Sequence, residues 1–215
     1  QPYFKKHGAE AEEKLIKQAD LVVANSTYLA SYGRKHNEKS FFIGQGCDLE
    51  MFQPEEIKSI PSTLEAIKKP IVGYVGSLTS QRLDIDLLVH LAESNSDWSL
   101  VLVGGEDEQF KKSKLHQLDN VHFLGFQKPE TLPAFIHGFD VCINPQLINE
   151  MSIGNYPRKI DEYLAMGKPV VATKTEGMIM FQEHVSLALD KYEFGEKIEQ
   201  SLKNNNAELS KERIK

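Results

Sequence analysis

The sequence predicts an α/β protein built on a Rossmann-like parallel sheet with helices on both faces. From Pro70 onward, short apolar runs alternate with longer stretches that have helical periodicity, which is the rhythm of strand–helix–strand units. The runs are apolar throughout instead of alternating with polar residues, as expected of parallel strands that are buried on both faces. With 215 residues and 40% apolar content, the chain can bury the core of one domain, or of one domain together with a remnant of another.

Six runs between Pro70 and Asp190 are the predicted strands of this sheet. They read IVGYVG, WSLVLVGG, NVHFLG, FDVCINP, KPVVAT and SLALD. The predicted helices between them cover about 84–93, 107–117, 129–137 and 157–166.

The first fifty residues predict a smaller unit. Residues 1–18 have the pattern of an amphipathic helix, ADLVVANS gives a strand at 21–24 followed by N-cap residues for a helix towards His36, and FFIGQGCD gives a second strand. The segment that follows is rich in Pro, Glu, Lys and Ser, as linkers are. We therefore divide the chain into a remnant of an N-terminal domain at 1–50, a linker at 51–69, the Rossmann-like domain at 70–190 and C-terminal helices at 191–215.

Composition and motifs exclude several classes of function. A net charge of -6 argues against a nucleic-acid partner held by a broad basic surface, and no apolar run has the roughly 20 residues of a membrane-spanning helix. The chain shows no signal peptide, and its two cysteines predict free thiols in a reducing compartment, the cytoplasm. No histidine spacing suggests a metal, and no P-loop, G-x-S-x-G elbow or complete dinucleotide fingerprint is present.

The stretch NYPRKIDEYLAMGKPVVAT predicts a loop, a helix that begins near Pro157 and stops at Gly167, and a buried strand. Lys159 and Glu162 lie three residues apart on one face of this helix. A lysine near a helix N-terminus suits a phosphate, and the carboxylate suits sugar hydroxyls. The alternative is a surface helix in which Arg158 pairs with Glu162 and Lys159 is solvated, and spacing alone favours this alternative.

Two further loops carry candidate ligand-binding residues. Gly76 and Ser77 follow the first strand of the sheet, where a backbone N–H and a hydroxyl can approach a ligand, and Arg82 adds a positive charge. The alternative is an ordinary tight turn in which Arg82 pairs with Asp84 or Asp86. Asn149 and Ser152 precede the Lys159 helix and suit either a sugar or phosphate contact or the capping of their own loop.

PRKIDEYLAMGKPVVAT resembles the donor-binding segment of retaining GT-B glycosyltransferases of the family-4 (group 1) type, in which P-x-K-x-x-E-Y-x-A-x-G-K-P-V-V recurs. INPQLINEMSIGNYPRK, IVGYVGSLTSQRLDIDLL and VHFLGF extend the resemblance, towards enzymes that build bacterial surface polysaccharides. Two positions depart from the pattern. Ser77 replaces an arginine, and Gly154 stands where many relatives have the first of two glutamates, with Glu150 four residues upstream.

The resemblance implies a nucleotide-sugar-binding domain. Arg82 and Lys159 would stabilise a departing diphosphate, Glu162 would hold the ribose, and the backbone at Phe126 and Gln127 would read the base, although Phe126 is alternatively a core residue. The donor would be a UDP or GDP sugar without a metal or other cofactor, and the acceptor, a glycan or lipid-linked molecule, would be held by residues upstream of Gln1. That upstream part would also make any peripheral membrane contact. Because this chain lacks the part that binds the acceptor, it is expected to be inactive alone.

Three alternatives remain open at this point. A sugar-nucleotide epimerase shares the GT-B architecture, but we place no pair of acid and base carboxylates. A nucleotide-sugar-binding module without catalysis would suit Ser77 and Gly154. A flavodoxin-like protein would explain the sheet but not the PRKIDEYLAMGKPVVAT segment.

Overall fold

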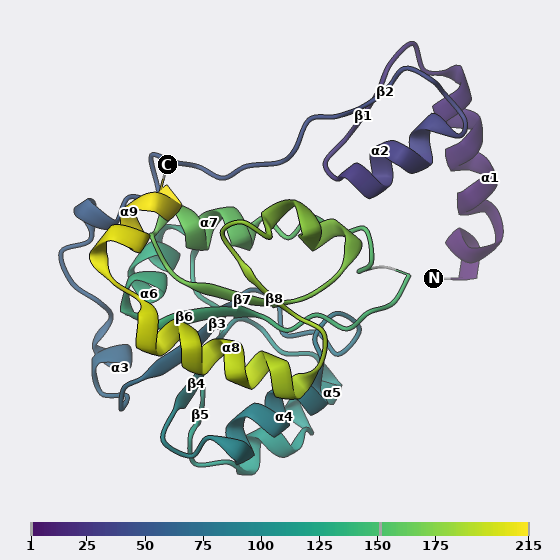
Figure 1. The fold of residues 1–215 in the computed structure, drawn as a ribbon. Helices are drawn as coiled ribbons and strands as arrows, with labels where there is room; N and C mark the ends of the chain where they lie inside the picture. Colours follow the sequence, from purple (N-terminus) through teal and green to yellow (C-terminus); the bar gives the residue numbers. More distant parts are fainter. Residues whose placement is uncertain (1, 151, 215) are drawn as a thin grey trace.

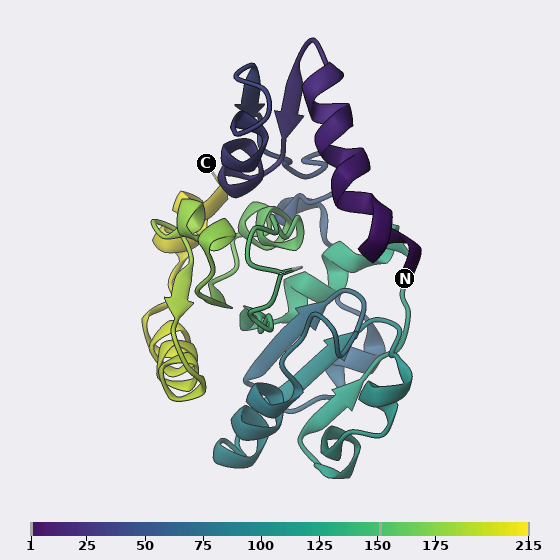
Figure 2. The ribbon, with the colours of Figure 1, turned by 90° about the vertical axis from the view of Figure 1, so that its right-hand side faces the viewer.

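The computed structural model describes residues 2–150 and 152–214, so Gln1 and Lys215, the ends of the first and last predicted segments, lie outside it, as does Met151. The chain folds into a small N-terminal unit and a larger α/β domain (Figure 1). A long segment around residues 43–61 connects them, and Figure 2 shows the unit beside the domain from a second direction.

The larger domain holds the predicted parallel sheet. Its strands are β3 (Ile71–Val75), β4 (Ser99–Val103), β5 (Val121–Phe123), β6 (Val141–Asn144), β7 (Val170–Thr173) and β8 (Ser186–Ala188). They lie in the order β5-β4-β3-β6-β7-β8, and every neighbouring pair is parallel. All six predicted strands are therefore confirmed, and the order reverses between β3 and β6, which is the point where open sheets of this kind bind ligands.

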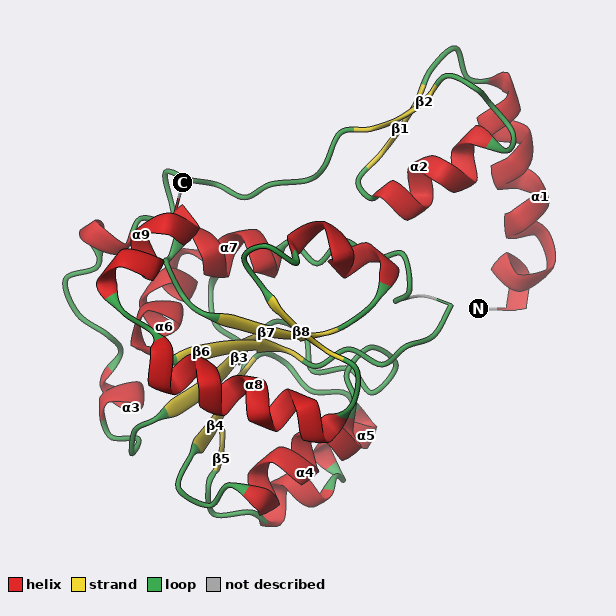
Figure 3. Cartoon of the chain, in the orientation of Figure 1, coloured by secondary structure: helices red, strands yellow, loops and turns green. Residues whose placement is uncertain are grey.

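Helices cover both faces of this sheet, as the apolar strands predicted (Figure 3). One face packs against α4 (Ile85–Ser94) and α8 (Lys191–Asn204), and α5 (Glu108–Lys111) and the 3-10 turn η2 (Lys114–Gln117) complete that layer. The other face packs against α3 (Ser62–Glu65), α6 (Leu132–Gly138) and α7 (Lys159–Ala165). Strand residues such as Val72 and Val101 are almost fully buried between the two layers.

The N-terminal unit consists of α1 (Pro2–Gln18), β1 (Val22–Ala24), α2 (Thr27–Arg34) and β2 (Ser40–Phe42). Ser26 caps α2 by accepting a hydrogen bond from the Leu29 N–H at 3.1 Å. The β2 strand ends just before Gly44 and Gly46, which were expected at its end and which adopt φ angles of 76° and 73° that an extended strand cannot accommodate.

Segment 51–69 contains the 3-10 turn η1 (Pro54–Glu56) and the short helix α3. Its residues Phe52 and Leu64 are buried in the core of the α/β domain. This segment therefore packs on the domain instead of crossing open solvent.

Two predicted helices differ in the structure. The helix predicted for 107–117 divides at Ser113 into α5 and η2, and that predicted for 129–137 begins with the 3-10 turn η3 (Pro129–Thr131) before α6. Pro133 lies in the first turn of α6, where its missing N–H is tolerated. The predicted break in the C-terminal helices is confirmed, since α8 ends at Asn204 and α9 (Ala207–Ile214) follows.

Within residues 2–150 and 152–214, no helix has the length and apolar character that crossing a membrane requires.

Candidate functional site

The helix that carries Lys159 and Glu162 is shorter than predicted. It begins at Lys159, with Arg158 as N-cap, and Pro157 lies two residues before it, where its carbonyl accepts a hydrogen bond from the Ile160 N–H at 2.9 Å. Gly167 ends the helix as predicted, with a φ of 68°. Most of α7 is buried, so it does not lie on the open surface, although the Arg158–Glu162 pair of the alternative reading is present.

Lys159 lies against the loop that follows β3. Its Nζ is 5.1 Å from the centroid of the Tyr74 ring. A methyl group built on Gly76 would lie 3.2 Å from Lys159 Cε and 3.0 Å from the Tyr74 hydroxyl. Lys159 therefore lies beside the Gly76 loop, with its ammonium group in a cation–π contact, and it remains partly exposed.

Tyr163 ties α7 to the same strand. Its hydroxyl accepts a hydrogen bond from the Val75 N–H at 2.8 Å, and the side chain is fully buried. The ladder between β3 and β6 ends at the pair Gly73↔Cys142, so Val75 extends beyond it and uses the hydroxyl as its partner. Sequence reasoning missed this residue, although the tyrosine is part of the EYLAMG segment.

The loop with Arg82 is fixed to the loop that follows β6. The Arg82 carbonyl accepts from the Leu147 N–H at 2.9 Å, and the Asn149 amide donates to the Gln81 carbonyl at 2.9 Å. The hydroxyl and N–H of Ser80 both donate to Asp107, at 2.8 and 2.7 Å. These bonds place Arg82 beside the Asn149 loop.

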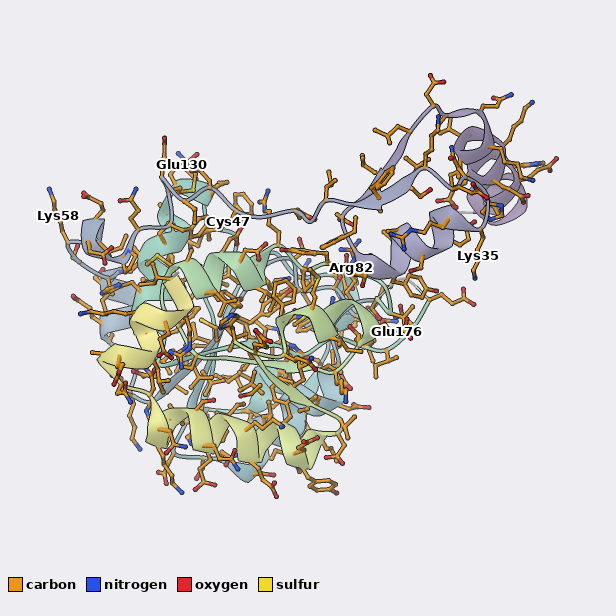
Figure 4. The ribbon with its side chains drawn as sticks, turned by 45° about the horizontal axis from the view of Figure 1, so that its top comes forward. Lys35, Cys47, Lys58, Arg82, Glu130 and Glu176 are labelled. Atoms are coloured by element: carbon orange, nitrogen blue, oxygen red, sulfur yellow. The ribbon has the colours of Figure 1, made fainter. Side chains whose placement is uncertain are left out.

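The Arg82 side chain is exposed, and Figure 4 shows it on the side of the α/β domain that faces the N-terminal unit in that view. Within the described ranges, no ion pair joins it to Asp84 or Asp86. Asp84 instead caps α4 by accepting from the Leu87 N–H. Ser77, at the start of the same loop, is exposed.

Asn149 and Ser152 form a compact turn. The Ser152 N–H donates to the Asn149 side chain at 3.1 Å, the Asn149 N–H donates to the Ser152 hydroxyl at 3.0 Å, and that hydroxyl donates to the Leu147 carbonyl. Ser152 is 2% exposed. The loop-capping role expected for these residues is therefore present in the structure.

Glu162 is 7% exposed and lines a cavity of about 380 Å³. Other residues of this cavity come from the turn that follows β2, such as Cys47, and from the start of α6, such as Leu132. Arg158 donates to Glu162 at 3.1 Å, so the predicted pair exists. Burial raises the pKa of Glu162, and Arg158 and Lys159 oppose that rise.

A turn from the N-terminal segment docks on α7 next to this cavity. The Tyr156 hydroxyl donates to the two carboxylate oxygens of Asp161 at 2.9 and 2.8 Å, and the backbone of Gly46 also hydrogen-bonds to Asp161. Burial raises the pKa of the Cys47 thiol to about 11, and the carboxylates of Asp161 and Glu162 contribute to that rise. Both cysteines are free thiols.

Phe126 follows β5 and is 77% exposed, so the alternative of a core residue is wrong. Gly125 precedes it with a φ of 65°, which turns the chain outward. The Gln127 amide donates to the Leu124 carbonyl at 2.8 Å, which fixes the turn and leaves an apolar ring beyond the end of the strand.

The structure gives a physical reason for glycine at position 154. A methyl group built there would lie 2.1 Å from a carbon of the Tyr28 ring, so a side chain at 154 and Tyr28 exclude each other. Tyr28 belongs to α2, so this contact joins the N-terminal unit to the loop in front of α7.

Three features lie at the carboxyl ends of β3 and β6. They are the ammonium group of Lys159, the glycine at position 76, where a ligand can approach the backbone closely, and the exposed loop that carries Arg82. A buried carboxylate and an exposed aromatic ring lie on neighbouring elements. This combination suits a ligand that carries phosphates, hydroxyl groups and a planar ring.

Comparison with known proteins decides the family. The profile of the family described as "Glycosyl transferases group 1" matches residues 69–204. The chain belongs to the group 1 glycosyl transferases. The predicted family is thus confirmed, and the matched region includes the whole sheet and α7.

One curated relative is described as a putative teichuronic acid biosynthesis glycosyltransferase TuaH of Bacillus subtilis. It is 28% identical over 171 residues, which are 76% of this chain and 42% of the relative. The chain therefore spans less than half the length of that protein.

Two solved structures share the fold. Anabaena Alr3699/HepE in complex with UDP-glucose aligns with a TM-score of 0.80 and 22% identity, over 99% of this chain and 63% of that one. Sucrose-phosphate synthase from Thermosynechococcus elongatus aligns with a TM-score of 0.73 and 24% identity, over 94% and 55%. These likenesses confirm the predicted fold, the carboxyl-terminal half of the GT-B architecture.

Proposed function

We propose that this chain binds a nucleoside-diphosphate sugar, of the UDP or GDP type, and supplies the donor half of a glycosyltransferase. The observation that carries the proposal is the position of Lys159, whose side chain lies against the Gly76 loop at the carboxyl end of β3. A diphosphate in that loop accepts hydrogen bonds from backbone N–H groups and from the ammonium group of Lys159. The Anabaena HepE structures, which hold UDP and UDP-glucose, support this choice of ligand.

The proposal also gives a role to each of the other candidate residues. Arg82 reaches the diphosphate from the far side of the loop, and Lys159 from α7, so two cations neutralise the charge of the leaving group. Glu162 accepts hydrogen bonds from the ribose hydroxyl groups, and Phe126 with Gln127 borders the base. Gly76, Ser77 and the Asn149–Ser152 turn form the floor and the sugar-side rim.

We further propose a retaining transfer that needs no metal ion, to a glycan or lipid-linked acceptor in surface polysaccharide synthesis. Two side-chain cations at one diphosphate support the metal-free mechanism, because they supply the charge compensation that a divalent ion gives elsewhere. A cytoplasmic location is supported by the two free thiols.

Calorimetric titration of the chain with UDP, GDP and ADP, without added metal, tests the proposal. We expect saturable binding of one nucleotide. Lys159→Ala should weaken it by about 10- to 100-fold, because hydrogen bonds to charged groups contribute about 1.5–3 kcal/mol. Lys211→Ala, which removes an exposed lysine of α9, is the matched control.

Two results would count against the proposal. Binding that Lys159→Ala leaves unchanged would place the nucleotide elsewhere. The absence of binding for all three nucleotides would contradict the donor-domain role of this chain.

A further inference from the structure

A cavity of about 410 Å³ lies on the face of the sheet that α4 and α8 cover, opposite the face that carries α7. Its walls come from the starts of α4 and α8, from the loop that follows β6 and from the carboxyl ends of β7 and β8. Figure 1 shows α4 and α8 on this face, where they contact each other. The volume lies in the range of about 300–1,000 Å³ that small-molecule sites occupy. Of the described residues that line this cavity, none has a role in the proposed donor site.

Two buried polar side chains in the lining lack a hydrogen-bond partner among the described residues. Gln146 follows β6 and is 4% exposed, and Thr173 ends β7 and is 7% exposed. The Gln146 Oε1 atom and the Thr173 hydroxyl oxygen are both buried without a partner. Native structures pair nearly all groups of this kind. Because neither oxygen has a hydrogen bond to lose, both are available to a ligand that donates hydrogen bonds.

The charged part of the lining is mainly acidic. Asp84 and Asp86 lie at the start of α4, and Asp190 precedes α8. None of these three carboxylates forms an ion pair within residues 2–150 and 152–214. Lys191, the cation of the described lining, has its Nζ 5.3 Å from the centroid of the Tyr192 ring, which lies outside the cavity. The partial positive charge at two helix starts offsets only part of the acidic excess, so the cavity favours a positively charged ligand.

The rest of the lining is apolar and consists of Leu87, Leu147, Ile148, Ala188, Leu189 and Phe194. Ile148 and Leu189 are 59% and 69% exposed, so hydrocarbon surface is accessible to a ligand. Among the described residues, no three carboxylate, histidine or cysteine side chains are grouped as a metal ion would require. Separated carboxylates around an apolar surface suit an aliphatic chain that carries ammonium groups, since its methylene groups and its charges need different surroundings.

We propose that this cavity binds a linear aliphatic polyamine. Its methylene groups pack against the leucine, isoleucine and phenylalanine side chains. Its ammonium groups pair with Asp86 and Asp190 at the two helix starts and donate hydrogen bonds to the Thr173 hydroxyl and the Gln146 amide oxygen. The inference is independent of the proposed function, because no residue of the donor site contributes to it.

Calorimetric titration of the chain with spermidine at physiological ionic strength tests the inference, with hexanol as a ligand that has the hydrocarbon but no charge. We expect saturable binding of spermidine and none of hexanol. Thr173→Val should weaken spermidine binding by about tenfold or more, because a buried hydrogen bond to a charged group is lost. Asp86→Asn should weaken it by about two- to fivefold, as expected of an exposed ion pair. Asp119→Asn, which removes the same charge at an exposed position outside the cavity, is the matched control and should leave the affinity unchanged.

Stability measurements distinguish a ligand contact from a structural role. Thr173→Val should leave the unfolding free energy of the unliganded chain unchanged or higher, because the hydroxyl that it removes is buried and unpaired. If this variant fails to fold, the comparison of Asp86→Asn with Asp119→Asn decides alone.

Three results would overturn the inference. They are the absence of saturable spermidine binding, equal weakening by Asp86→Asn and Asp119→Asn, and unchanged affinity in a folded Thr173→Val variant. Equal weakening would identify non-specific attraction to an acidic protein. A chain that binds UDP but not spermidine would refute this inference and leave the proposed function intact.

Discussion

Tyr163→Phe removes the hydroxyl that connects α7 to β3, which accepts from the Val75 N–H and donates to the Val75 carbonyl at 3.5 Å. The Tyr163 hydroxyl is the partner of the Val75 N–H, at 2.8 Å, in a fully buried environment. Phenylalanine keeps the ring but leaves that N–H unpaired, which costs about 1–3 kcal/mol. In a domain of this size each kcal/mol lowers the melting temperature by about 2–4 °C, so we expect a decrease of about 2–12 °C.

Urea denaturation and calorimetry of the wild type and Tyr163→Phe give both quantities. Tyr192→Phe, at a tyrosine that is 63% exposed, is the control and should change the unfolding free energy by less than about 0.5 kcal/mol. UDP affinity should also fall, because Val75 immediately precedes Gly76. A Tyr163→Phe variant as stable as the control would refute the view that this bond connects α7 to β3.

Three other perturbations probe the same region. Gly104→Ala would place a methyl group 1.9 Å from the Gly76 carbonyl oxygen. It should therefore lower UDP affinity and lower the unfolding free energy, measured by urea denaturation, by at least about 1–3 kcal/mol. Unchanged values of both would contradict the close packing of Gly104 on the Gly76 loop. The pKa of Cys47 is raised to about 11, so its reaction with iodoacetamide should become about tenfold faster for each pH unit between 8 and 10. Bound UDP should slow this reaction. The same rate with and without UDP would show that the nucleotide does not bind at the cavity of Cys47. Burial raises the pKa of Glu162, so UDP affinity should decrease on acidification from a higher pH than for an ordinary glutamate, whereas Glu162→Gln should show no such decrease. The raised pKa means that, at pH values between the unfolded and folded pKa of Glu162, the folded chain binds more protons than the unfolded chain. The contribution of Glu162 to the unfolding free energy should therefore fall as pH rises through that range.

The sheet could be predicted because its strands are apolar along their whole length and are separated by turn residues. The end of α7 was equally predictable, since Gly167 adopts the left-handed conformation that its position required. The start of α7 was not, because Pro157 suits either a first helical turn or the loop before it. Sequence periodicity does not distinguish these two places.

The contacts between distant segments were beyond sequence reasoning. Spacing along one helix favoured a solvated Lys159, whereas the structure places it over Tyr74, from a strand 85 positions away in the chain. The absence of a side chain at Gly154 could be noticed in the sequence. The reason for glycine at this position is the ring of Tyr28, which occupies the space of a side chain. That contact is set by the packing of the N-terminal unit on the α/β domain, and no local sequence pattern reports it.

The most direct test of the central claim is an amide ¹H–¹⁵N titration of the chain with UDP alone. We predict that the largest shifts fall on Gly76 and Ser77, with further changes at Lys159 and Phe126, and that they saturate together. Saturable UDP binding whose shifts leave Gly76, Ser77 and Lys159 unmoved would contradict the proposed donor site, and would show that the nucleotide binds elsewhere on the chain.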